Sequence, residues 1–187
     1  MKKLLFLSLF ILNWFFQLSS QVIWSNDFSH PADWIISNEV GNFDNWVIGN
    51  NVPSGSFPIT SINSTTSSNG YALFDSDLLC SGNQIANISI ANPIDLSGFD
   101  AVAVRFEQQY RKFCDSTFVI VSIDNGATWT KFPTNIGLAN NDETNNPTLT
   151  QVTISNVAGG QSNVLIGFQF HSLIPHFHLL VVAMHGW

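Results

Sequence analysis

The sequence has few charged residues and very few basic ones. Charged side chains make up 10% of its 187 residues, and only six are lysine or arginine. Two of the six, Lys2 and Lys3, stand at the very start of the chain, and the formal net charge is −7 at pH 7. A chain without a basic patch has few groups to neutralise phosphates, so nucleic acid and anionic membrane surfaces are poor partners for it.

Cysteine and long apolar runs are also scarce. The two cysteines of the sequence are Cys80 and Cys114. In an exported chain such a pair predicts a single disulfide, with two free thiols as the alternative. After the first 20 residues, no segment approaches the roughly 18 to 20 apolar residues that a membrane-spanning helix needs. We therefore expect no membrane insertion of the mature protein.

The first 20 residues have the layout of a secretory signal peptide. Lys2 and Lys3 precede an apolar stretch that ends in two small residues, Ser19 and Ser20, as signal peptides do. Cleavage there leaves about 167 residues, enough for one domain with its own core. We expect a protein that is secreted or held at the cell surface.

Short strand-like runs recur through the rest of the chain, and no segment shows a sustained helical period. In residues 101–110, Val102, Val104, Phe106, Gln108 and Tyr110 share one face, which is the alternation of a strand. No long internal repeat supports a propeller. About nine strands predict an all-β, antiparallel two-sheet β-sandwich. The expected strands are residues 22–28, 45–49, 71–75, 85–90, 101–110, 117–123, 128–132, 149–155 and 163–170.

Residues 122–129 spell Ser-Ile-Asp-Asn-Gly-Ala-Thr-Trp, the Asp-box pattern found in sialidases. A sialidase needs several arginines around a carboxylate, and this chain has only Arg105 and Arg111. We therefore interpret the motif as a hairpin turn. In it Asp124 accepts backbone hydrogen bonds, Gly126 adopts a positive φ, and Trp129 covers the hairpin.

Other catalytic patterns are missing too, including the nucleophile elbow, the zinc-protease helix and the phosphate loop. Glycoside hydrolysis usually needs two facing carboxylates, and Glu107 on a strand is the one appealing acid. We expect no enzyme. A small jelly-roll glycosidase or lyase is the alternative, which two carboxylates roughly 5 to 9 Å apart would favour.

Two kinds of binding residue stand out. Asp75 and Asp77 lie two apart at the end of an expected strand, where their oxygens could bind calcium; the alternative is that both cap a turn. Trp34, Trp46 and Tyr110 are candidates for stacking on sugar rings if they are exposed. The alternative for each aromatic residue is a place in the core.

Several motifs occur in a characteristic order: NDFS near the mature start, NGYALFDSD, ANPIDLSGFDAVAVRFEQQYRKF, STFVIVSIDNGATWTKF and QSNVLIGFQF. Together they resemble the MAM-like, concanavalin A-like jelly-roll domain of secreted Bacteroidetes proteins, which are often exported by the type IX pathway. The resemblance implies a jelly-roll β-sandwich over residues 21–170. It also implies a non-catalytic module that binds glycan or protein and belongs to a larger adhesin or secreted hydrolase. Structural calcium is implied as well, with Asp27 as the first-strand ligand and Asp75 or Asp77 as the others.

Residues 171–187 depart from this family. Its members end in a strand resembling GYAWMVDDV, whereas this chain ends in HSLIPHFHLLVVAMHGW. Ala-Met-His-Gly-Trp can be written in codons whose shifted frame reads Tyr-Ala-Trp-Met, so we hypothesise a frameshifted translation of the last strand. For that reason we discount His176 and His178 as a zinc pair. The apolar segment should either pair in a new register or leave an open sheet edge.

Overall fold

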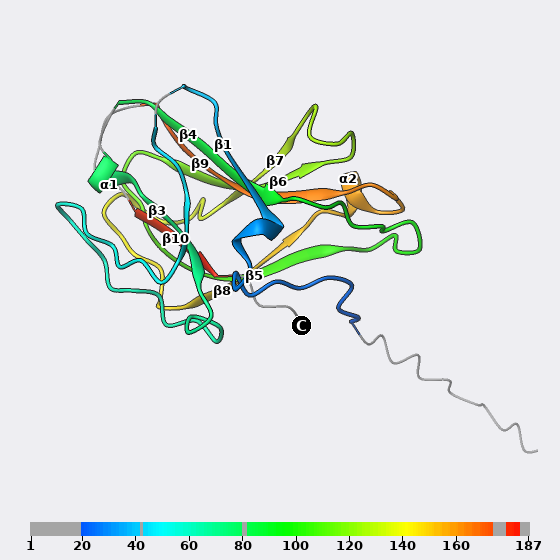
Figure 1. Cartoon of the computed structure of the whole chain (residues 1–187), viewed down its shortest axis with the longest axis horizontal. Helices are drawn as coiled ribbons and strands as arrows, with labels where there is room; N and C mark the ends of the chain where they lie inside the picture. Colours follow the sequence, from blue (N-terminus) through cyan, green and yellow to red (C-terminus); the bar gives the residue numbers. More distant parts are fainter. Residues whose placement is uncertain (1–19, 42, 80–81, 174–178, 184–187) are drawn as a thin grey trace, which may run out of the picture.

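Strands with alternating apolar side chains make up most of the structure. The computed structural model describes residues 20–41, 43–79, 82–173 and 179–183. Its strands form two five-stranded sheets in which all neighbouring strands are antiparallel. The sheets lie one above the other in Figure 1. The predicted all-β, two-sheet antiparallel sandwich is confirmed.

The two sheets have five strands each, in the following orders. Sheet A runs β1 (Trp34–Asn38), β4 (Gln84–Ile90), β9 (Leu165–Ser172), β6 (Ser116–Ser122) and β7 (Thr130–Thr134). Sheet B runs β2 (Val47–Gly49), β3 (Tyr71–Asp75), β10 (Leu179–Ala183), β5 (Ala103–Arg111) and β8 (Thr148–Thr153). Among these strands, the chain stays within one sheet only from β2 to β3 and from β6 to β7, a pattern consistent with a jelly roll.

Helical structure is limited to single turns. The described residues contain the 3₁₀ turn η1 (Pro31–Asp33) and the helices α1 (Ser76–Leu79) and α2 (Ser155–Ala158). In the described part of the chain, no helix has the length and apolar character needed to cross a membrane. The predicted signal peptide falls almost wholly outside the described residues, which begin at Ser20.

The core lies between the two sheets and follows the predicted alternation. On β5 the inward residues Val104, Phe106 and Tyr110 are at most 5% exposed. Phe106 packs edge to face on Phe168 with ring centroids 4.9 Å apart. Burial of each such ring contributes about 2 to 3 kcal/mol. The period of two found in the sequence therefore fixes which side of each strand faces the partner sheet.

The prediction of a first strand at residues 22–28 is wrong, because these residues form no strand. The Asn26 side chain accepts hydrogen bonds from Phe28 N at 2.8 Å and from Trp34 Nε1 at 3.1 Å, and Phe28 has a φ of 61°. An asparagine that bonds the amide two residues on makes a turn, which ends extended structure. One edge strand of sheet A is instead β1, which sequence reasoning missed.

The end of the chain supplies a strand to sheet B. β9 continues to Ser172, past the expected boundary at residue 170. β10 then pairs with both β3 and β5, with Val181 opposite Leu73 and opposite Gln109. The apolar C-terminal segment, for which we expected either a new pairing or an open sheet edge, therefore pairs with two strands of sheet B. The frameshift hypothesis stays a prediction, and residues 174–178 and 184–187, with His176 and His178, lie outside the described residues.

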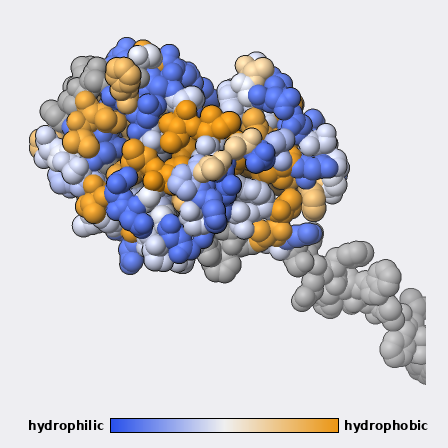
Figure 2. Space-filling view, viewed as in Figure 1, coloured by the Kyte–Doolittle hydropathy of each residue, from blue (hydrophilic) through white to orange (hydrophobic). Residues whose placement is uncertain are grey.

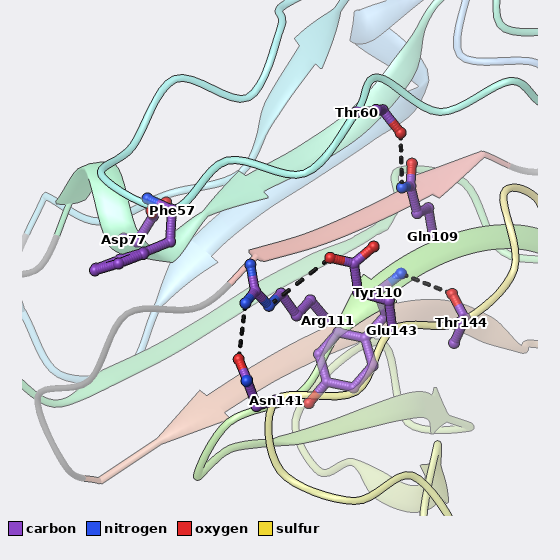
Figure 3. A network of polar contacts seen from close by, with 9 residues as sticks. All are labelled: Phe57, Thr60, Asp77, Gln109, Tyr110, Arg111, Asn141, Glu143 and Thr144. Carbon is purple, nitrogen blue, oxygen red and sulfur yellow. Dashed lines mark hydrogen bonds and ion pairs between the residues drawn. The ribbon is translucent and has the colours of Figure 1, made fainter.

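A long loop, residues 51–69, covers part of the outer face of sheet B, and we call it the covering loop. Its Ile59 and Ile62 form a second buried cluster with Tyr71 and Leu73 of β3. Gln109 Nε2 of β5 donates to Thr60 Oγ1 at 3.1 Å (Figure 3). The loop thus takes up a sheet surface that would otherwise face solvent.

Candidate functional site

The hairpin between β6 and β7 has the predicted turn. Asp124 Oδ1 accepts hydrogen bonds from Thr128 N at 2.9 Å and from Ser122 Oγ at 2.7 Å. The Thr128 hydroxyl donates to Asp124 Oδ2 at 2.6 Å, and this bond is the largest cause, with the other two, of a pKa lowered to about 2. Gly126 has a φ of 82° and lies against the Trp129 ring. The motif is a braced turn, as interpreted from the sequence.

The three aromatic residues predicted to stack on sugars are buried, so that prediction is wrong. Trp34, Trp46 and Tyr110 are 7%, 2% and 0% exposed. Trp34 stacks on the Phe28 ring at 4.5 Å, and Trp46 Nε1 donates to Ala86 O at 3.0 Å. Their size and their polar tips made them candidates, but the same features suit aromatic residues in a core with hydrogen-bond partners.

The three aspartates predicted to bind calcium are not brought together. Asp27 accepts hydrogen bonds from Ser29 and from Asn69, just before β3. Asp75 ends β3, so the strand places it about 20 Å from Asn69. No cluster of three acidic, histidine or cysteine side chains suited to a metal occurs among the residues described. Calcium binding stays a prediction.

Asp75 and Asp77 hold the covering loop in place. Asp75 Oδ2 accepts from Ser54 N at 2.8 Å, and Asp77 Oδ2 accepts from Phe57 N (Figure 3). Both aspartates are at most 5% exposed. Burial, reinforced by the neighbouring Asp75 carboxyl, raises the pKa of Asp77 to about 6. Gly55 lies so close that an added Cβ would come within 1.8 Å of Asp77 Oδ1. Asp75 and Asp77 therefore anchor the covering loop to the end of β3.

Of the two cysteines in the predicted disulfide, the structure describes one. Cys114 is an exposed free thiol, and Cys80 lies outside the described residues. Asp75 and Arg111, which precede the two cysteines by a few residues, both flank Leu179 at one end of sheet B. That placement brings the two cysteine-bearing segments to one end of sheet B, but Cys114 is a free thiol here, so the structure does not show the predicted disulfide, which stays a prediction.

The outer face of sheet A carries a row of side chains that crosses all five strands. Cross-strand pairing aligns them in the order Ser37, Asn87, Gln169, Phe118 and Pro133. Five strands at normal spacing give this row a length of about 19 Å. Figure 2 shows the upper outline of the molecule dipping between the β6–β7 hairpin and the opposite end of the sheet. We call these five residues the sheet A row.

A fixed polar network holds the middle of the row. Gln169 Nε2 donates to Glu39 Oε1 at 2.9 Å and to Asn87 Oδ1 at 2.8 Å. Asn87 Nδ2 also donates to Glu39 Oε1, at 2.9 Å. Gln169 Oε1 is buried and accepts no hydrogen bond from any residue that the structure describes. An acceptor left in that state costs about 1 to 3 kcal/mol.

An aromatic ring lies next to this network. Phe118 is directly opposite Gln169 and is half-buried. Lys131 Nζ lies 5.9 Å from the centre of the Phe118 ring, and the His171 ring lies 6.3 Å from it. Burial lowers the pKa of His171, and Lys131 lowers it further. The ring therefore has a neutral imidazole and a lysine beside it at neutral pH.

Sequence reasoning missed this face although the signal was present. Phe118 and Ile120 alternate with Val119 and Val121 along β6, and Gln169 alternates with Phe168 and Phe170 along β9. A glutamine between two phenylalanines marks an outward polar position. What the sequence does not give is the order of strands, which alone places Gln169 beside Phe118.

A larger groove, of about 640 Å³, lies between the N-terminal segment 20–26 and the start of β5. Its floor includes the core residues Val102, Ile154 and Ile166. β10 pairs with β5 up to Ala183, which lies opposite Glu107. Glu107 is two residues along β5 from Arg105, which lines the groove. Since residues 184–187 follow and are not described, we assign no ligand to this groove.

Comparisons with known proteins give a fold and no family. No protein-family model matches the chain, and no curated protein matches it either. A structure of TmCBM61 in complex with β-1,4-galactotriose aligns with a TM-score of 0.53 at 12% identity, covering 90% of this chain and 99% of that one. The K1 cleaved adhesin domain of Lys-gingipain from Porphyromonas gingivalis W83 aligns with a TM-score of 0.52 at 15% identity, covering 86% and 94%. The chain shares its β-sandwich fold with a carbohydrate-binding module and an adhesin domain.

Proposed function

We propose that this protein is a non-catalytic binding module that recognises a glycan on the outer face of sheet A. The observation that carries the proposal is the pairing of Phe118 with Gln169, which sets a partly exposed ring beside the network that Gln169 and Asn87 make with the exposed Glu39 carboxylate. A pyranose presents an apolar face and a rim of hydroxyl groups. The ring suits the apolar face, and amide and carboxylate groups suit the hydroxyls.

The polar groups of this face are positioned before any ligand arrives. Glu39 accepts hydrogen bonds from both Asn87 and Gln169, which fixes the rotamers of the two amides. A ligand that meets fixed side chains loses less affinity to the ordering of the site. The sheet A row thus has the ring, the hydrogen-bonding groups and the length for several sugar units in line.

The other sheet offers less room for an extended ligand. The covering loop buries Tyr71 and Leu73 on the outer face of sheet B, and Thr65 donates two hydrogen bonds to Glu107 there. TmCBM61, which shares the fold, was solved in complex with β-1,4-galactotriose, and the gingipain domain is an adhesin domain. These neighbours support a binding role by analogy of fold.

The alternative of a glycosidase or lyase receives no support from the sheet A face. Glu39 is the one carboxylate among the residues named for this face, and general acid–base hydrolysis uses two. Glu107, the acid favoured in the sequence, is bonded to Thr65 under the covering loop. A protein ligand in place of a glycan is the remaining alternative for the same face.

The export of the protein, its place in a larger adhesin or hydrolase and its calcium content belong to the same proposal. They rest on the signal-peptide pattern and the family resemblance. A glycan array probed with residues 21–187, in calcium and in chelator, tests the glycan proposal. We expect binding to a group of related glycans. An array without binding in either condition would contradict it.

A further inference from the structure

The strands of sheet A carry one positive charge and no negative charge. Lys131 on β7 is the one lysine or arginine among β1, β4, β9, β6 and β7, and these five strands contain no aspartate or glutamate. In the whole chain, by contrast, Asp and Glu number 13 and Lys and Arg number six. The strands of sheet A therefore differ in the sign of their charge from the chain that surrounds them.

Lys131 lies on the same face as the sheet A row, because it is two residues from Pro133 on β7. Its cross-strand partner on β6 is Ile120. Its Nζ lies over the Phe118 ring, 5.9 Å from the ring centre. A pyranose that stacks on Phe118 must therefore lie against this ammonium group. The lysine is exposed in the free protein, so a bound sugar would displace part of its hydration.

The ionisable groups around Lys131 do not pair with it. No acid in the described part of the chain forms an ion pair with Lys131. Glu39 accepts hydrogen bonds from two side-chain amides of the sheet A row. Asp115, just before β6, is 5% exposed and accepts from a hydroxyl and a backbone amide. His171 is neutral at neutral pH, because burial and then Lys131 lower its pKa. The ammonium group is thus available to a charged ligand.

A ligand without charge and a ligand with negative charge differ in what they offer this lysine. A neutral sugar would take water from a charged group and supply no charged partner, which costs free energy. A carboxylate or sulfate would replace the water with a hydrogen bond between two charged groups, about twice as strong as a neutral one. Glu39 opposes such an anion only weakly. It is bonded to β9, two strand spacings or about 10 Å from β7, and salt screens charges at that range.

We propose that Lys131 determines the specificity of the sheet A site, and that it selects glycans with an anionic group on the sugar that lies on Phe118. The inference deepens the glycan proposal and rests on it. The anionic group is the carboxylate of a uronic acid or a sulfate ester, which offer the lysine the same chemistry. Glu39 and the amides bonded to it then meet the hydroxyl groups of the next sugar along the sheet A row.

The test compares acidic and neutral trisaccharides of the same linkage. β-1,4-Mannotriose and the β-1,4-mannuronate trisaccharide differ only in the exocyclic carbon, which is a hydroxymethyl group in one and a carboxylate in the other. Cellotriose and its β-1,4-glucuronate counterpart form a second pair, and 6-sulfated mannotriose and cellotriose are the sulfate arms. By calorimetry at low salt, we expect at least one acidic member to bind about ten times more tightly than its neutral partner. The preference should shrink as salt is added.

The outcomes separate this inference from the glycan proposal. If the acidic members bind no more tightly than their neutral partners, the selection by charge is wrong and the glycan site still stands. If no trisaccharide of the set and no glycan on the array binds, both proposals fail. Binding of sulfated but not uronate members, or the reverse, identifies which anionic group the site takes.

Three variants test Lys131 itself. Lys131→Met removes the charge but keeps an apolar stem opposite Ile120, and should abolish the difference in affinity between acidic and neutral trisaccharides. Lys131→Arg keeps the charge and should keep most of the difference. Arg111→Met is the control, because it removes the same charge from sheet B, where Arg111 pairs with Glu143 at 3.8 Å. A preference for acidic glycans that survives Lys131→Met, or that Arg111→Met abolishes equally, would overturn the inference.

Discussion

Gln169 Nε2 donates to Glu39 Oε1 across 2.9 Å, and this bond ties the centre of sheet A to the residue that follows its edge strand. The same Glu39 oxygen also accepts a hydrogen bond from the side-chain amide of Asn87. Hydrogen bonds to a charged acceptor are about twice as strong as neutral ones. Glu39 therefore fixes the polar half of the sheet A row.

Glu39→Gln should weaken that network without removing the acceptor oxygen. We expect glycan affinity to fall several-fold and the free energy of unfolding to fall by about 1 kcal/mol. Calorimetry and urea denaturation measure the two effects. The matched control is Glu143→Gln, which removes an exposed carboxylate that pairs with Arg111 at 3.8 Å, away from this face. If both variants bind glycan equally well, Glu39 does not position the site.

Gly55→Ala should loosen the covering loop. A Cβ at this position would come within 1.8 Å of Asp77 Oδ1 and 2.1 Å of its Cγ, so the loop or the buried aspartate must move. Overpacking of this kind costs about 1 to 3 kcal/mol, readable from urea denaturation. Gly137→Ala is the control, because an added Cβ there meets no atom within 4 Å. Equal stability of the two variants would show that the loop does not rest on Asp77.

Asp115 should make the protein less stable as the pH rises from about 4 to 8. Burial raises its pKa from 3.8 to about 6 in the folded protein, against the opposing hydrogen bond from Tyr110. The folded state therefore holds this proton more tightly than the unfolded state. The resulting stabilisation is full below about pH 4 and is lost as the pH rises through 6.

Asp115→Asn isolates this effect, because Asn can still accept from Tyr110 and Phe113 and carries no charge. Two pKa units correspond to about 3 kcal/mol. We expect the variant to be more stable than the wild type at pH 8 by up to that amount and to be similar at pH 4, as measured by chemical denaturation. Parallel pH profiles of the two proteins would contradict the raised pKa.

Calcium should raise the melting temperature if the family resemblance extends to its metal site. A ligand that binds only the folded state stabilises it in proportion to its affinity and concentration. We expect a shift of several degrees between calcium and chelator, reduced in either Asp27→Asn or Asp77→Asn. The two variants distinguish the two ends of β3. An unchanged melting temperature would contradict the proposal that the folded protein binds calcium.

The sequence predicts the sandwich well because the two-residue alternation of apolar and polar side chains recurs in each strand. Val104, Phe106 and Tyr110 face the core as their spacing requires, and Asp124 braces its turn with bonds to residues a few positions away. Both inferences depend on local chemistry. The missed strand β1 follows a proline-containing turn, where local signals favour a break.

The binding face could not be predicted in the same way. Asn87, Gln169 and Phe118 lie far apart in the sequence and meet only through the order β4, β9, β6. Trp34, Trp46 and Tyr110 were the more conspicuous aromatic residues, but they pack inside. Whether an aromatic side chain is core or surface depends on the register of its strand against neighbours that the sequence does not name.

The most direct test of the binding face is the affinity of Phe118→Ala for the glycans that the wild-type protein binds. Phe118 is half-buried on the surface of sheet A, so its removal should cost little stability while removing the stacking platform. We expect affinity to fall at least tenfold, whereas Phe57→Ala, which removes a ring that is 54% exposed on the covering loop, should bind as the wild type does. Unchanged affinity of a folded Phe118→Ala protein would contradict the assignment of the glycan site to sheet A.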